Sequence, residues 1–110
     1  MTLDDLAAYG ANVEEGLGRC MNMESLYLRL AETIKTDVNF DALESALHEG
    51  RLKDAFAAAH ALKGVLANLS ITPLQKPVEE ITELLRYETP ADYDALLARI
   101  LEERDRYRAL

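Results

Sequence analysis

His60 stands in a short run of residues whose types suit chemistry on one face of a helix. Lys63 follows it by three positions and Gly64 by four, which places the three side by side at about 100° per residue. A neutral imidazole is a good nucleophile, and a neighbouring ammonium can neutralise an anion beside it. The spacing therefore predicts a histidine that a phosphoryl group or the backbone of a partner protein can reach.

Gly64 interrupts a segment that otherwise favours a helix. Glycine inside a helix costs about 0.5–1 kcal/mol relative to alanine, and the residues around it are rich in Ala and Leu. One interpretation is steric, because a missing side chain one turn from His60 leaves the ring accessible. The other is that Gly64 lets a neighbouring helix pack closely or is simply tolerated, and both are equally open from the position alone.

The segment that carries this run is predicted to be the central helix, from about Leu52 to Leu69. Apolar residues recur in it every three or four positions, as in an amphipathic helix. Their mean direction points well away from His60, so the histidine is expected on the solvent face. Small side chains and lysines surround it there. The candidate partner-binding residues are Lys53, Phe56, Ala57, Ala61 and Ala67.

Two of these candidates have alternatives. Phe56 lies at the border between the apolar face and the His60 face, and a place in the core is favoured over a role as an anchor for a partner helix. Lys53 either adds to a positive rim around His60 or is an ordinary solvated lysine.

Single polar residues and glycines divide the N-terminal part of the chain into short helices. Thr2 begins a capping pair, and Gly10 ends the helix that follows. This helix either covers one end of the fold or adds to the surface that meets a partner. Asn12 is predicted to cap a second short helix that runs to Cys20 and that Gly16 weakens.

Longer helices follow in the remainder of the chain. Asn22 is predicted to cap the first of them, which runs towards Val38. Asn39 or Asp41 begins the next one, and Gly50 stops it as a left-handed cap. The loop to the central helix is therefore expected to be tight.

Two Thr-Pro pairs mark the last helix starts. Thr72 with Pro73 and Thr89 with Pro90 each place a capping residue before a proline at the first helical position. Long helices joined by short loops run antiparallel, so the expected fold class is all-α: an antiparallel up-down four-helix bundle with additional short N-terminal helices. We expect a single domain over residues 1–110, with short helices in 1–20 and the bundle in 22–108.

The composition narrows the classes of partner. The 110 residues carry 20 acidic and 12 basic side chains, a net charge of −8, which disfavours nucleic acid and anionic membranes. No apolar run approaches the roughly 18 residues of a membrane helix, and polar residues follow Met1. A lone Cys20 forms neither an internal disulfide nor a cysteine metal site. We expect a cytoplasmic protein, neither secreted nor anchored, without a metal or cofactor of its own.

The charge is uneven along the chain. Only the segment 51–64 has a positive balance, with Arg51, Lys53 and Lys63 against Asp54. The segments before and after it are both acidic. We therefore expect an acidic body with a small positive window around His60.

Residues 60–64, HALKG, resemble the His-x-x-Lys-Gly signature of histidine-containing phosphotransfer (HPt) domains. An Ala-rich turn precedes the signature in this chain, and an Asn-Leu pair and a Pro-initiated helix follow it, as in that family. Residues 13–17, VEEGL, and residues 26–28, LYL, resemble the segment that the family places before its bundle. The resemblance covers most of the chain and is best from about residue 12 to residue 87.

The resemblance implies a phosphorelay intermediate. In the family, the matching histidine accepts a phosphoryl group from the aspartyl phosphate of a receiver domain and passes it to the aspartate of another. His60 would be the phosphoacceptor, Lys63 a cation near the phosphoryl oxygens, and Gly64 the clearance. The partners would be response-regulator receiver domains, a hybrid sensor histidine kinase, or both, with the divalent metal on the receiver. The chain would be a monomeric phosphocarrier without a kinase or nucleotide site.

Two positions depart from the family pattern. Many members have Gly after the Asn-Leu pair, where a left-handed residue ends the helix, and this chain has Ser70, which predicts a less tight turn. Some members carry a Gln on the following helix that hydrogen-bonds the active imidazole, and the comparable place here is Thr82. Thr82 is therefore the candidate for orienting the His60 ring.

Two other functions stay open. The chain could be a helical-bundle interaction module that has kept the fold without transferring phosphate, or an HPt module that acts as part of a larger sensor kinase system. The remaining candidates have structural interpretations: His48 as a donor to the carbonyls of a helix end, and Cys20 as a small buried residue.

Overall fold

Helices form all the regular structure of the protein. A computed structural model describes all 110 residues. The N-terminal part contains α1 (Leu3–Tyr9), α2 (Val13–Arg19), α3 (Glu24–Thr33) and the short 3-10 helix η1 (Ile34–Thr36). The remainder contains α4 (Asn39–His48), α5 (Leu52–Leu69), α6 (Thr72–Arg86) and α7 (Tyr93–Arg108). None of these helices is long and apolar enough to cross a membrane.

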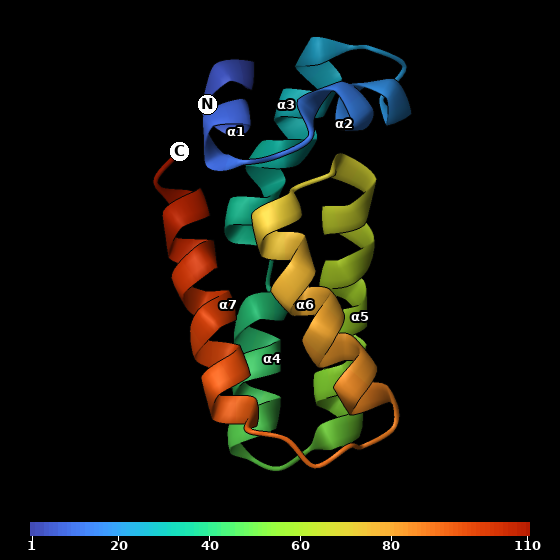
Figure 1. The fold of residues 1–110 in the computed structure, drawn as a ribbon, viewed down its shortest axis with the longest axis vertical. Coiled ribbons are helices and arrows are strands. Elements are labelled where there is room, and N and C mark those ends of the chain that lie inside the picture. Colours follow the sequence, from blue (N-terminus) through green and yellow to red (C-terminus); the bar gives the residue numbers. More distant parts are fainter.

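The helices α4 to α7 form an antiparallel up-down bundle (Figure 1). Each runs opposite to the one before it, and α7 closes the ring because it packs against both α6 and α4. The short helices α1, α2 and α3 lie at one end of the bundle, beside the C-terminus of the chain. The predicted fold class is confirmed, and the molecule is elongated, 40 × 24 × 19 Å.

Buried tyrosines connect the N-terminal helices to the bundle. The Tyr27 hydroxyl donates to the Leu69 carbonyl at 2.9 Å, and the Tyr107 hydroxyl donates to the Ala31 carbonyl at 2.6 Å. Each bond satisfies a polar group inside the core. Tyr9 of α1 packs edge-on against Tyr107, with 5.5 Å between the ring centroids. The first helix therefore covers the end of the bundle.

Gly16 lets α2 lie directly on the bundle. A Cβ atom at this position would come within 2.5 Å of the Tyr27 ring and 2.6 Å of the Leu69 carbonyl oxygen. Nothing lies within 4 Å of the corresponding point at Gly18. The close approach of α2 thus requires a glycine at position 16, although glycine weakens the helix itself.

Several predicted helix ends are confirmed, namely the caps of the two N-terminal helices, the left-handed glycines and the bounds of the central helix. Thr2 and Asp5 form a reciprocal capping box at the start of α1, and the Asn12 side chain accepts a hydrogen bond from a backbone amide at the start of α2. Gly10 and Gly50 both take the left-handed conformation. The central helix α5 has the predicted bounds.

The predicted start and end of α3 are wrong. Met23, not Asn22, is its N-cap, because Asn22 takes a left-handed φ of 55° in the preceding loop, a conformation that Asn tolerates well. The helix passes into η1 before it reaches Val38, which is exposed.

The two Thr-Pro pairs do not cap helices. Ile71 is the N-cap of α6, and Thr72 is already its first residue. The last helix begins at Tyr93, because the Asp92 side chain caps it by accepting a hydrogen bond from a backbone amide. Pro90 lies outside that helix, in the preceding loop.

Candidate functional site around His60

His60 projects from the exposed face of α5, near the middle of the helix. Its ring stacks on Phe56, one turn earlier, with 5.5 Å between the centroids and 23° between the planes. Phe56 is half-buried and packs against the core. The favoured place of Phe56 in the core is therefore confirmed in part, because one side of the ring packs there and another contacts the imidazole. Its role as an anchor for a partner helix stays a prediction.

Thr82 does not orient the imidazole. Its side chain is fully buried in α6, and its hydroxyl donates to the Val78 carbonyl at 2.6 Å. The hydroxyl hydrogen of Thr82 is thus used within its own helix, and no hydrogen bond joins the buried Thr82 oxygen to the exposed His60 ring. The candidate role for Thr82 is wrong, and the contact that orients His60 is the stack on Phe56.

Gly64 lies under open space one turn beyond His60. A Cβ atom at this position would meet nothing within 4 Å, so close packing against another helix does not explain the glycine. The left-handed glycines are Gly10 and Gly50 alone, so the backbone conformation does not explain it either. The interpretations that remain are clearance above the helix and simple tolerance.

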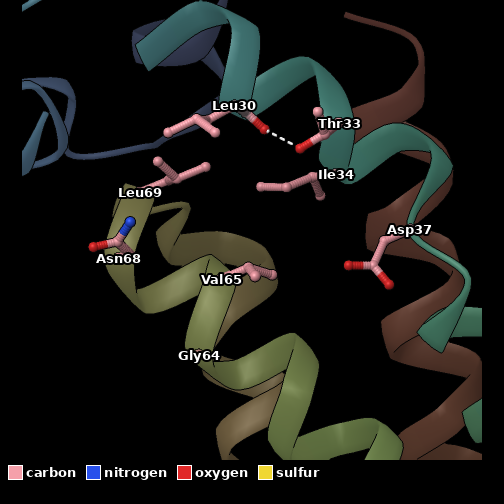
Figure 2. Close-up of a pocket in the computed structure, with 8 residues that line it drawn as sticks. All are labelled: Leu30, Thr33, Ile34, Asp37, Gly64, Val65, Asn68 and Leu69. Atoms are coloured by element: carbon pink, nitrogen blue, oxygen red, sulfur yellow. Dashed lines mark hydrogen bonds between the residues drawn. The ribbon is translucent and has the colours of Figure 1, made fainter. Parts of the chain in front are cut away.

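A groove of about 450 Å³ begins at Gly64 and runs between α5 and the segment formed by α3 and η1. Half of its lining residues are hydrophobic, and Thr33, Asp37 and Asn68 are polar. Figure 2 shows Leu30 and Ile34 on one side, with Val65 and Leu69 of α5 facing them. The sequence pattern does not predict this groove. Val65 is the signal that could have indicated it, because it is an apolar residue outside the apolar stripe of α5. In the structure Val65 is 39% exposed.

Charged residues of α6 lie on the other side of the site. The Lys63 ammonium is 3.5 Å from a carboxylate oxygen of Glu83, and the Arg86 Nε donates to the same carboxylate at 3.2 Å. The Arg86 guanidinium lies 5.0 Å from the centroid of the Phe56 ring. Hydrogen bonds from Arg86, and the nearby charges of Arg86 and Lys63, hold the pKa of Glu83 below its usual range. Arg86 thus brings a second cation to this face of the molecule.

The positive window is therefore built differently from the sequence prediction. The Arg51 guanidinium pairs with Glu49 and also with Asp54, at 2.6 Å from the latter, so its charge is locally neutralised. Lys53 is exposed on α5. Arg86 of α6, which the sequence places in an acidic segment, shares the carboxylate of Glu83 with Lys63. These two cations and one carboxylate leave a net positive charge near Phe56.

The predicted small residues lie in two places. Ala57 and Ala61 are exposed on the His60 face of α5. Ala67 is half-buried near the end of the helix, where its carbonyl accepts a hydrogen bond from Arg19 at 2.9 Å. Small side chains thus lie next to His60 along its own helix, together with the Phe56 ring, and Ala67 lies beside α2.

Ser70 ends α5 as tightly as a glycine. Its φ is 56°, and Arg19 donates to its hydroxyl at 2.6 Å while the hydroxyl donates to Glu15 at 2.8 Å. The hydrogen bonds from Ser70 and Arg19 lower the pKa of Glu15. The prediction of a less tight turn is wrong, because residues of α2 support the left-handed serine.

His48 and Cys20 lie away from this site. His48 is exposed in the last turn of α4, in a shallow depression that Glu44 and Asp94 also line. The predicted hydrogen bond from His48 to the helix end is not present. Cys20 is buried, as predicted. No three His, Cys, Asp or Glu side chains gather closely enough to hold a metal ion.

Comparison with known proteins matches most of the chain to a family model. A family model described as the Hpt domain matches residues 30–110. This range includes α4 to α7 and the run from His60 to Gly64. It begins after residues 13–17 and 26–28, so the resemblance drawn from those two stretches lies outside the match. Searches of curated proteins and of solved structures found no significant match.

Proposed function

The chain belongs to the Hpt domain family, and we propose that it is a phosphorelay protein in which His60 carries the phosphoryl group. Hpt domains are phosphocarriers of two-component signalling and not kinases. The observation that carries the assignment is the accessible imidazole of His60, with Lys63 beside it and open space above Gly64.

The second histidine of the matched range is a weaker phosphoacceptor. His48 shares its depression with Glu44 and Asp94, and two carboxylates repel a phosphoryl group of the same sign. The face of His60 has two basic side chains, Lys63 and Arg86, against the one carboxylate of Glu83 that both contact. The electrostatic environment therefore favours His60.

The proposed reaction is a reversible transfer between a receiver aspartate and the His60 ring. The oxygen–phosphorus bond of the aspartyl phosphate breaks, and its electron pair stays on the carboxylate oxygen. A nitrogen–phosphorus bond forms with the imidazole lone pair, while the other ring nitrogen keeps its proton. Transfer to the next receiver aspartate reverses these changes. Such a step depends on in-line positioning and charge neutralisation, which suits a site with an open ring and nearby cations.

The groove next to Gly64, which is lined by both apolar and polar residues, is the proposed binding site for a surface of the receiver domain that has an apolar part. It begins one turn from His60 on the same helix, so a receiver bound there keeps its phosphorylated aspartate within reach of the imidazole. Val65 at the rim of the groove is an exposed apolar side chain that such contact would bury.

Incubation with a phosphorylated receiver domain tests the proposal. We expect the chain to acquire phosphate that is labile in acid and stable in alkali, as phosphohistidine is. His60→Gln should abolish the label, and His48→Gln, the matched control, should retain it. Absence of label on the folded wild-type chain would instead favour an interaction module that does not transfer phosphate.

Lys63→Ala should slow transfer without unfolding the domain. Lys63 is half-buried and makes a single ion pair with Glu83, so its loss removes a cation from the site and little packing. Stopped transfer reactions give the rate, and circular dichroism gives the helix content. A variant that transfers at the wild-type rate would contradict the role of Lys63 in neutralising the phosphoryl group.

A further inference from the structure

We propose that Glu83 is a positioning residue for phosphotransfer, which holds Lys63 and Arg86 together beside the His60 face and releases Lys63 when His60 is phosphorylated. This inference rests on the proposed function. It assigns a role to a residue of α6 that belongs neither to the signature run nor to the helix that carries it.

The contacts of Glu83 differ in strength. Arg86 approaches its carboxylate through three nitrogen–oxygen contacts, of 3.2, 3.3 and 3.4 Å. Lys63 approaches through one contact of 3.5 Å, to Oε1. The Glu83 side chain is 51% exposed, so water competes for both ion pairs. Lys63 is therefore the cation that leaves this carboxylate more easily.

Phosphorylation changes the competition for Lys63. A phosphohistidine brings about −2 charges and three acceptor oxygens to the face that Lys63 shares with His60, whereas Glu83 offers one negative charge. The stem of Lys63 is flexible, so its ammonium can reach either anion. Arg86 keeps its contacts with Glu83 and stays over Phe56. Glu83 thus sets how readily Lys63 becomes available to the phosphoryl group.

Neutralising Glu83 should therefore stabilise the phosphorylated state. In Glu83→Gln, Lys63 has no competing carboxylate partner in α6. We expect the equilibrium between phosphorylated receiver and phosphorylated His60 to shift towards His60 by up to about fivefold, and the phosphohistidine to discharge more slowly to the receiver. The ratio of labelled full-length chain to labelled receiver at equilibrium measures the shift.

Glu80→Gln is the matched control. Glu80 is also half-exposed on α6 and pairs with an arginine, Arg99 of α7, at 3.4 Å, but it makes no contact with the His60 face. Its substitution changes the net charge by the same amount. We expect no shift of the equilibrium in this variant, and an equal shift in both variants would overturn the proposal.

A double-variant comparison shows whether Lys63 mediates the effect. In a Lys63→Ala background, Glu83→Gln should no longer shift the equilibrium, because no ammonium is left to be released. Glu83→Asp, which keeps the charge, should behave more like the wild type than Glu83→Gln does.

Two results would overturn the inference alone. They are an unshifted equilibrium in Glu83→Gln and a shift of equal size with and without Lys63, each in a chain that is still labelled at His60. A wild-type chain that takes no label would overturn the proposed function as well.

Discussion

Gly16 and Gly64 both lie inside helices, and their surroundings differ. At Gly16 a Cβ atom would collide with Tyr27 and with the Leu69 carbonyl, so the fold itself requires the glycine. At Gly64 a Cβ atom would collide with nothing. Neither packing nor backbone conformation therefore requires a glycine at position 64, and clearance for an approaching partner stays our proposal for it.

Substitutions at Gly64 should separate stability from transfer. Gly64→Ala is expected to raise the free energy of unfolding by about 0.5–1 kcal/mol, because it removes the helix cost of glycine and meets no neighbour. Gly64→Leu should also fold, yet block docking of the receiver domain and abolish transfer. Urea unfolding and the transfer assay check the two expectations. If Gly64→Leu transferred normally, clearance would not be the reason for the glycine.

Residue spacing predicted that the three residues of the signature run lie together, but it did not predict which residues of α6 contact them. His60, Lys63 and Gly64 lie three and four positions apart on one helix, so helix geometry alone places them together. The contacts of Glu83 and Arg86 depend on the rotation of α6 about its axis relative to α5. Periodicity shows which face of a helix is apolar, but it does not show which polar residue at the edge of that face meets a neighbour.

Helix α2 packs against the C-terminal end of α5, the helix that carries His60, and stabilises it. Its Arg19 and Glu15 hydrogen-bond the left-handed Ser70, and its Gly16 lies against the Leu69 carbonyl. The sequence suggested only a weak helix with two glycines in this region. The support for α5 is a tertiary contact between residues about fifty positions apart, which local patterns do not reveal.

A pair of glycine substitutions in α2 tests this packing. Gly16→Ala is expected to lower the free energy of unfolding by about 1–3 kcal/mol, because the added methyl group overpacks the contact with Tyr27. Gly18→Ala, which faces open space, should leave stability unchanged or raise it by up to about 1 kcal/mol. Urea unfolding of both variants gives the comparison. Equal effects of the two substitutions would contradict the close seating of α2.

Helix existence was easier to predict than helix starts. The amphipathic pattern of α5 fixed both of its ends, whereas α3, α6 and α7 begin at residues other than the predicted caps. The loop before α7 contains three residues that can cap or initiate a helix, namely Thr89, Pro90 and Asp92, and the structure uses Asp92. Which of several neighbouring residues caps the helix depends on the path of the preceding loop across the end of the bundle. The local sequence does not determine that path.

Buried tyrosines make the free energy of unfolding of the entire domain depend on pH in the alkaline range. Burial raises the pKa of Tyr9, Tyr27 and Tyr107 above the ordinary value. In the unfolded chain these phenols ionise near about pH 10, whereas in the folded protein they keep their protons. The unfolded state therefore binds fewer protons above that pH, and the free energy of unfolding falls as the pH rises.

Tyr107→Phe should weaken this pH dependence. Below about pH 9 the variant is expected to lose about 1 kcal/mol, because the Ala31 carbonyl loses its hydrogen bond. Above about pH 10, its stability should fall less steeply than that of the wild type, by up to about 1.4 kcal/mol per pH unit. Urea midpoints at pH 8 and pH 11 measure both effects. Identical slopes for the two proteins would show that Tyr107 also ionises near its ordinary pKa when folded.

The chain has two histidines in different electrostatic surroundings, so His48 serves as the control for the assignment of His60 as the phosphoacceptor. The most direct measurement locates the phosphoryl group after incubation with a phosphorylated receiver domain, by fragment mass spectrometry under alkaline conditions. We predict phosphate on the His60 ring and none on His48. Phosphate on His48 or on a carboxylate, or a folded chain that takes up none, would contradict the assignment of His60 as the phosphoacceptor.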